Sequence, residues 1–167
     1  MENLIHLCED WLEELRFNYN TIYGWERTLT NGATGNAQTN YTCNEFWNNP
    51  FDFYQELSGL PAGSYGLSVQ AFNRPGSNAT AYAEYKEGTN NVTAELYVNS
   101  DASRVSNVFS YTGNTTGEKV TDNDFHCNSD GDNYWVPNGM LGASLYFADE
   151  NVYKTSVAAL VEDGNLK

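Results

Sequence analysis

The sequence predicts an all-β fold, an antiparallel β-sandwich of the jelly-roll type with a short N-terminal helix. Two observations predict it: short runs in which apolar and polar residues alternate, and clusters of Gly, Asn, Asp and Ser between those runs. Alternation gives each strand one apolar face, and a second sheet must cover that face. The length of 167 residues suits a single domain of this kind.

An amphipathic helix is expected over residues 3–16. Apolar side chains recur there at the spacing of one helical face, and acidic side chains occupy the other face. We therefore expect a helix or linker at 1–17 and the β-sandwich domain at 18–167. The N-terminus lacks the basic and apolar segments of a signal peptide, so the chain is expected to be either cytosolic or an excised piece of a longer protein.

The expected strands follow in chain order. The first two, at 51–57 and 65–71, flank the turn Ser58–Gly63, an arrangement typical of a β-hairpin with a Pro/Gly turn. Further period-two runs occur at 79–85, 92–98, 105–111, 143–147 and 154–161. The connection 112–133 is long, acidic and rich in Gly and Asn, and loops of that length tend to be functional or mobile.

The charge composition argues against two classes of partner. The chain has 8 Lys and Arg against 22 Asp and Glu, a formal net charge of −14. Nucleic acids and anionic membranes require clustered basic side chains, and those of this chain are scattered. No apolar run approaches the roughly 20 residues of a membrane span. The sequence therefore predicts a soluble protein, without nucleic-acid binding or membrane insertion, whose ligand is neutral or cationic.

The three cysteines, Cys8, Cys43 and Cys127, leave an odd thiol in any pairing. Their spacing matches neither a zinc site nor a redox Cys-x-x-Cys motif. Buried or free thiols are therefore expected, and a single disulfide is the alternative.

The long connection contains one candidate metal site. Asn128, Asp130 and Asp132 place side-chain oxygens at alternating positions, as a calcium loop does. The bidentate Glu and the flanking helices of a complete EF-hand are missing. A structural calcium ion at these residues is one expectation, and an ordinary solvated acidic loop is the other.

A longer motif covers residues 51–76, where the sequence is FDFYQELSGLPAGSYGLSVQAFNRPG. This segment resembles a galactose-binding-domain-like module of large secreted and surface polysaccharide-degrading proteins of Bacteroidetes, in which the run is approximately fdvyQtltgLpaGtYtvsvqgfyRpG. Further segments resemble that module in the same order: Gly24-Trp25, Glu45-Phe46-Trp47-Asn48, Ala94–Asn99, Trp135–Met140, Tyr153–Val157 and Val161–Lys167. The module's last strand normally continues past the point where this sequence stops, which suggests a longer parent protein.

The resemblance implies a non-catalytic carbohydrate-binding module, secreted or on the cell surface, beside catalytic domains of a larger glycan-degrading protein. The chemistry of sugars agrees, because a pyranose stacks its apolar face on Trp or Tyr and its hydroxyls bond polar side chains. The chain has 4 Trp and 12 Tyr. A neutral plant-type polysaccharide or oligosaccharide is the expected ligand.

The candidate binding residues come from strand order. If successive strands run antiparallel, the loops 41–50, 73–78 and 99–104 lie at one end of the sandwich. The side chains expected to contact the sugar there are Trp47, Arg74, Asn73, Tyr41 and Asp101. Trp135 is a further expected contact, which could reach either end of the sandwich. Tyr54 and Gln55 are expected to serve only the strand architecture. Two other functions stay open: a structural or adhesive spacer domain of a bacterial surface protein, and a glycoside hydrolase, although no motif singles out a catalytic pair among the acids.

Overall fold

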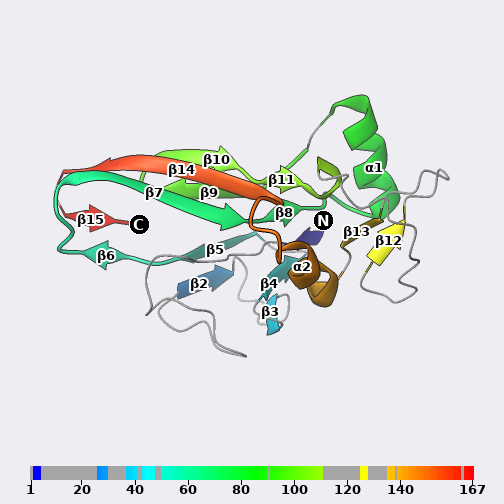
Figure 1. Cartoon of the computed structure of the whole chain (residues 1–167), viewed down its shortest axis with the longest axis horizontal. Coiled ribbons are helices and arrows are strands. Elements are labelled where there is room, and N and C mark those ends of the chain that lie inside the picture. The colour runs from blue at the N-terminus through cyan, green and yellow to red at the C-terminus, as the bar shows by residue number, and fades with distance from the viewer. Residues whose placement is uncertain are drawn as a thin grey trace.

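Figure 1 shows a computed structural model of the chain, which describes residues 2–4, 26–29, 37–40, 43–47, 50–89, 91–110, 125–127, 135–137, 139–162 and 164–167. These residues form mostly strands, with two α-helices and one 3-10 turn. The strands are β1 (Glu2–Leu4), β2 (Glu26–Leu29), β3 (Ala37–Asn40), β4 (Cys43–Trp47), β5 (Phe51–Tyr54), β6 (Leu57–Ser58), β7 (Gly63–Gln70), β8 (Phe72–Asn73), β9 (Glu95–Val98), β10 (Asp101–Arg104), β11 (Ser106–Asn107), β12 (Phe125–Cys127), β13 (Trp135–Pro137), β14 (Lys154–Val161) and β15 (Asn165–Leu166). The helices are α1 (Asn78–Glu87), η1 (Val108–Ser110) and α2 (Met140–Tyr146).

The longest ladder pairs β7 with β14 over eight residues of each strand. The strands are antiparallel, and Leu67 lies opposite Val157 in the register. Both side chains pack against a buried cluster, the sheet core, whose members are Phe46, Val69, Ala71, Val92, Ala94, Leu96 and Val105. Apolar alternation therefore has its expected cause here, and the predictions of strands at 65–71 and 154–161 are confirmed.

The turn between β6 and β7 does not close a hairpin. β6 pairs with β15, whereas β7 pairs with β14, so the chain passes from one ladder to another at both turns (Figure 1). The Leu60 N–H donates to the Gly164 carbonyl oxygen at 3.1 Å, and this bond joins the two turns. The predicted hairpin of 51–57 with 65–71 is wrong, because alternation identifies strands without identifying their partners.

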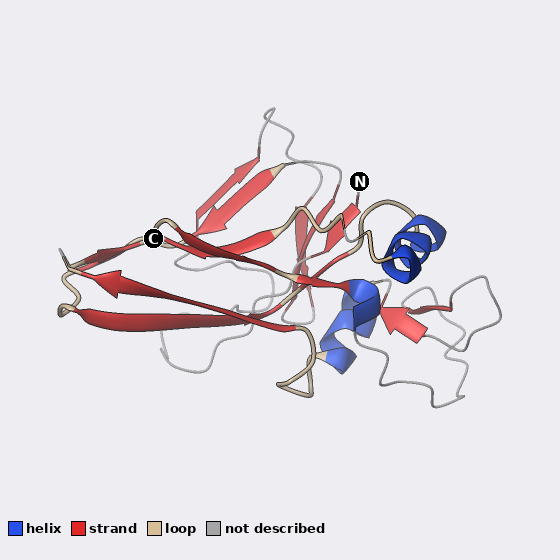
Figure 2. Ribbon diagram, turned by 90° about the horizontal axis from the view of Figure 1, so that it is seen from above, coloured by secondary structure: helices blue, strands red, loops and turns tan. Residues whose placement is uncertain are grey.

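Two predicted strands are helices instead. The segment 79–85 lies in α1 and the segment 143–147 lies mostly in α2. At the start of α1, the Ser77 hydroxyl accepts a hydrogen bond from the Thr80 N–H, and Gly88 ends the helix in the left-handed conformation. These caps satisfy terminal backbone groups, and the alanines of α1 favour a helix over a strand. Figure 2 shows both helices at the opposite end of the molecule from the β6–β7 turn.

Three further predictions need correction at their ends. The helix expected over 3–16 is wrong at Asn3 and Leu4, which lie in β1 and pair with β4; residues 5–16 lie outside the described residues. The strand expected at 92–98 is confirmed only over β9, which forms a hairpin with β10. The strand expected at 105–111 is only the short β11, and the chain then turns into η1.

The described ladders consist of one three-stranded sheet, β1-β4-β3, and six strand pairs. They support a β-rich fold, and the jelly-roll order of a complete sandwich stays a prediction. None of the helices in the described segments is long and apolar enough to cross a lipid bilayer.

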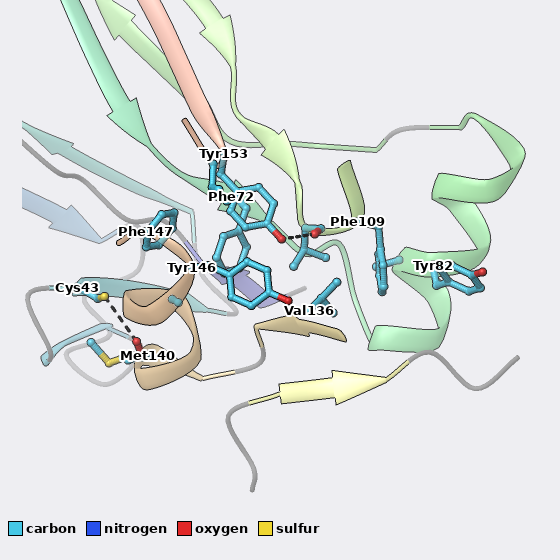
Figure 3. Close-up of a cluster of buried hydrophobic side chains, with 13 residues drawn as sticks. Cys43, Phe72, Tyr82, Phe109, Val136, Met140, Tyr146, Phe147 and Tyr153 are labelled. Atoms are coloured by element: carbon cyan, nitrogen blue, oxygen red, sulfur yellow. Dashed lines mark hydrogen bonds between the residues drawn. The ribbon is translucent and has the colours of Figure 1, made fainter. Parts of the chain in front are cut away.

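A second buried cluster, the aromatic core, lies at the helical end of the molecule (Figure 3). Its members are Cys43, Phe72, Ala81, Tyr82, Val108, Phe109, Val136, Met140, Ala143, Tyr146, Phe147, Val152 and Tyr153. The ring of Tyr153 packs against Phe72 with centroids 4.9 Å apart and against Phe147 at 6.0 Å. Its hydroxyl donates to the Val108 carbonyl oxygen at 2.6 Å, so this polar group is satisfied within the core.

We expect Tyr153→Phe to lower the free energy of unfolding by about 1–2 kcal/mol, because the buried carbonyl of Val108 loses its donor. Urea denaturation measures this change. Tyr65→Phe is the matched control, since that hydroxyl also donates to a backbone carbonyl, Pro61 at 2.9 Å, but at an exposed position. Equal losses in the two variants would contradict the role assigned to burial.

The paired turns generate a second prediction. Gly59 and Gly164 both have left-handed backbones, with φ of 74° and 82°. An added Cβ would lie 3.3 Å from the Leu60 carbonyl oxygen at Gly164 and would meet nothing within 4 Å at Gly59. We expect Gly59→Ala to cost about 1 kcal/mol of stability and Gly164→Ala to cost about 1 kcal/mol more. Thermal unfolding of both variants checks the difference, and a larger loss at Gly59 would be inconsistent with this packing.

Candidate functional site

Asn73, a predicted sugar contact, is completely buried. Its side-chain oxygen accepts a hydrogen bond from the Thr93 N–H at 3.3 Å. The parallel pairing of β8 with β11 places Asn107 opposite it, and the Asn107 side-chain oxygen accepts from the Phe109 N–H at 2.8 Å. Both side-chain amides therefore accept hydrogen bonds from backbone donors outside the strands, Thr93 before β9 and Phe109 in η1. The prediction that Asn73 contacts a ligand is wrong, because its side chain is completely buried and bonds the backbone of Thr93.

Arg74 follows directly and is only partly buried. Loss of water around its guanidinium lowers the pKa of Arg74 from its ordinary value, although an arginine remains charged at neutral pH. The next residue, Pro75, is buried, and its ring restricts the backbone φ where the chain leaves β8. Arg74 thus keeps partial exposure at the helical end of the molecule.

The structure describes the backbone positions of Trp47 and Trp135. Trp47 ends β4 opposite Glu2, and Trp135 begins β13 opposite Cys127. β1 lies beside β8, and β13 lies beside η1, so the structure brings these strands to the same end as Asn73. Tyr41 lies outside the described residues.

Asp101 does not join that group. It pairs with Val98 at the far end of the β9–β10 hairpin, whereas Thr93, before β9, contacts Asn73. Val98 comes five residues after Thr93, a distance of roughly 17 Å along an extended chain. Asp101 was expected at the same end as Asn73 because 79–85 was counted as a strand. Since that segment is a helix, every later loop is assigned to the opposite end of the molecule.

A surface cluster appears instead beside that hairpin. We name the tyrosine–carboxylate cluster by its members, Glu26, Asp52, Tyr54, Glu56, Tyr97 and Lys167. On β5, Phe51 and Phe53 face the sheet core, where their ring centroids lie 4.1 Å and 5.5 Å from that of Phe46. Strand alternation then places Asp52 and Tyr54 on the opposite face of β5.

Asp52 is the centre of the cluster. Its Oδ1 accepts a hydrogen bond from the Tyr97 hydroxyl at 2.7 Å, and its Oδ2 lies 3.4 Å from the Lys167 ammonium. The same ammonium lies 3.7 Å from the centroid of the Tyr54 ring. The Tyr54 hydroxyl donates to Glu26 Oε2 at 2.8 Å. One lysine, two phenols and two carboxylates thus form a continuous chain of contacts.

The backbone of Lys167 is held separately from its side chain. Its N–H donates to the Asn99 side-chain oxygen at 3.0 Å, and its carbonyl oxygen accepts from the Asn99 N–H at 2.7 Å. Asn99 has φ of 54°, in the left-handed region that asparagine tolerates, at the turn between β9 and β10. The hairpin that supplies Tyr97 therefore also positions Lys167.

The electrostatics of the cluster are negative. Three carboxylates, Glu26, Asp52 and Glu56, act on the tyrosines, and Lys167 supplies one positive charge. Burial, the hydrogen bond to Asp52 and nearby negative charge raise the pKa of Tyr97 well above its usual range. The hydrogen bond to Glu26, followed by desolvation and nearby carboxylates, raises the pKa of Tyr54. Both phenols are therefore neutral donors under ordinary conditions, in a field that favours cations.

No protein-family model, curated protein or solved structure matches this chain. The resemblance to a carbohydrate-binding module thus supports a proposal rather than a family assignment.

The described segments contain no group of three His, Cys, Asp or Glu side chains that could hold a metal ion. The candidate calcium ligands Asn128, Asp130 and Asp132 lie outside the described residues. Cys43 is a buried thiol whose Sγ lies 3.6 Å from the Met140 carbonyl oxygen, as expected for a structural cysteine. Cys8 lies outside the described residues.

Sequence reasoning missed this cluster and assigned Tyr54 to strand architecture alone. A usable signal was the sequence Phe51-Asp52-Phe53-Tyr54, because alternation places an acid and a tyrosine on one face. Tyr97 carries a similar signal, since its neighbours Leu96 and Val98 are buried. The contacts with Glu26 and Lys167 depend on tertiary structure and have no local signal.

The raised pKa of Tyr97 predicts a pH dependence of stability. As the pH rises above about 10, the unfolded chain loses the Tyr97 proton before the folded chain does, so the free energy of unfolding falls. We expect this fall to be steeper for the wild type than for Tyr97→Phe in urea titrations between about pH 8 and pH 11. Tyr65→Phe is the control, because its hydroxyl bonds a carbonyl rather than a carboxylate. Parallel slopes for wild type and Tyr97→Phe would contradict the prediction.

Proposed function

We propose that this chain is a non-catalytic carbohydrate-binding module and that the tyrosine–carboxylate cluster is its binding site. The observation that carries the proposal is the set of contacts around Asp52, which joins Tyr97 and, through Lys167, the ring of Tyr54 at the surface. A pyranose has apolar C–H faces that stack on aromatic rings and hydroxyls that bond carboxylates. The cluster offers both kinds of group within one small area.

The cluster is also held in place before any ligand arrives. Asp52 and Tyr54 lie on β5 and Tyr97 on β9, and the hydroxyl of each tyrosine is bonded to a carboxylate. Side chains that are already ordered lose less conformational entropy on binding. This preorganisation favours a recognition site, and sites on strands are better defined than sites on loops.

The sequence supports the same proposal. Asp52 and Tyr54 lie within the segment 51–76 that resembles the carbohydrate-binding module, and the net charge of −14 disfavours acidic glycans. We accordingly propose a neutral or cationic polysaccharide or oligosaccharide as the ligand, within a secreted or cell-surface glycan-degrading parent protein that supplies the catalytic domains. Arg74, Trp47 and Trp135 are proposed contacts of a second, alternative site at the helical end, and Tyr41, outside the described residues, stays a predicted sugar contact.

Affinity electrophoresis in gels that contain plant polysaccharides, together with calorimetry on soluble oligosaccharides, tests the proposal. We expect retention of the wild type and at least about 10-fold weaker binding by Tyr54→Ala, because the stacking ring is lost. The melting temperature should change by only a few degrees, since Tyr54 is partly exposed. Tyr65→Ala is the matched control: it is a partly buried strand tyrosine outside the cluster.

The remaining outcomes separate the alternatives. Loss of binding by Trp47→Ala, with Tyr54→Ala unaffected, would move the site to the helical end. Release of reducing ends would indicate a glycoside hydrolase, and failure to retain any glycan would favour the spacer function. Repeating the gels and the melting curves with EDTA tests the proposed calcium ion at Asn128, Asp130 and Asp132, whose removal should lower the melting temperature.

A further inference from the structure

We propose that the saccharide bound by the tyrosine–carboxylate cluster carries an ammonium group, as a deacetylated amino sugar does. In this proposal, which rests on the proposed function, the ligand's ammonium replaces that of Lys167. The Lys167 ammonium lies 3.7 Å from the Tyr54 ring centroid and 3.4 Å from Asp52 Oδ2. An aromatic face and a carboxylate on the same ammonium are the elements by which proteins recognise such cations.

A neutral sugar fits this arrangement less well. To stack on the face of Tyr54 that Lys167 covers, it must displace the ammonium. Asp52 would then lose its counter-ion, with Glu26 and Glu56 contributing further negative charge. A sugar that carries its own ammonium restores both contacts, so the exchange leaves the charge of the cluster unchanged.

Lys167 is suited to being displaced. Its side chain is 39% exposed, as is that of Asp52, and water and salt weaken an ion pair at such a position. Its backbone N–H and its backbone carbonyl oxygen both form hydrogen bonds with Asn99. The side chain can therefore rotate away while the pairing of β15 with β6 is kept.

The orientation of Asp52 also favours a cation. The Tyr97 hydroxyl donates to Oδ1, which fixes the carboxylate and leaves Oδ2 directed at the ammonium. The phenol is a donor to Asp52, so it does not compete for the cation. Both tyrosines thus have defined functions, Tyr54 as the ring under the ammonium and Tyr97 as the residue that positions the carboxylate.

The experiment compares glucosamine disaccharide with its N-acetylated form by calorimetry, using the intact chain. We expect the wild type to bind the free amine at least about 10-fold more tightly than the acetylated form. Lys167→Met removes the competing ammonium at similar chain length and should strengthen binding of the amine several-fold. Lys154→Met removes an equal charge from an exposed position on β14 and should change the affinity less than about 2-fold.

Asp52→Asn and Glu150→Gln form a second matched pair, since each removes one negative charge. The preference for the amine should disappear in Asp52→Asn and persist in Glu150→Gln. If both variants lost the preference for the amine equally, net charge alone would explain the attraction, and the inference would be overturned. Equal binding of the two disaccharides, without a gain in Lys167→Met, would also overturn it while leaving saccharide binding intact. Failure of both disaccharides and of every other glycan would instead overturn the proposed function.

Discussion

The antiparallel ladder of β7 with β14 organises the rest of the molecule. At one end of the ladder, one turn connects β6 to β7 and another connects β14 to β15. The hydrogen bond from the Leu60 N–H to the Gly164 carbonyl oxygen joins these two turns. At the other end, the Ala71 N–H donates to the Tyr153 carbonyl oxygen at 3.0 Å, which extends the pairing into the aromatic core. The ladder thus connects at one end to β15, which precedes Lys167, and at the other end to the aromatic core through Tyr153.

The sequence predicted the two strands of this ladder, at 65–71 and 154–161, but it predicted neither their pairing nor most of their surroundings. The alternation in 154–161 favours a strand, because the residues that alternate toward the interior, at 155, 157, 159 and 161, are β-branched or small. In 79–85 the alternating residues are alanines and tyrosines, which fit a helix equally well. Ser77 and Gly88 carried the deciding signal as caps. Which strands pair with each other depends on tertiary contacts, which a local pattern does not contain.

The candidate site shows the same limit. One misassigned element, the helix at 79–85, changed the parity of the strand count and moved Asp101 to the other end of the molecule. Asparagine is common in loops, yet Asn73 lies on β8 and is completely buried. Asp52 and Tyr54 could have been recognised from alternation on β5, whereas the position of Lys167 depends on Asn99 in a distant hairpin.

The ion pair between Asp52 and Lys167 joins residues that are 115 positions apart in the sequence. Bringing the two ends of so long a segment together has an entropic cost. The contacts that the intervening strands form on folding must offset it. Asp52 and Lys167 are therefore expected to meet only late in folding, after β15 has joined β6. An incompletely folded chain would lack the tyrosine–carboxylate cluster, so the affinity for the proposed ligand would also report whether β15 has paired with β6.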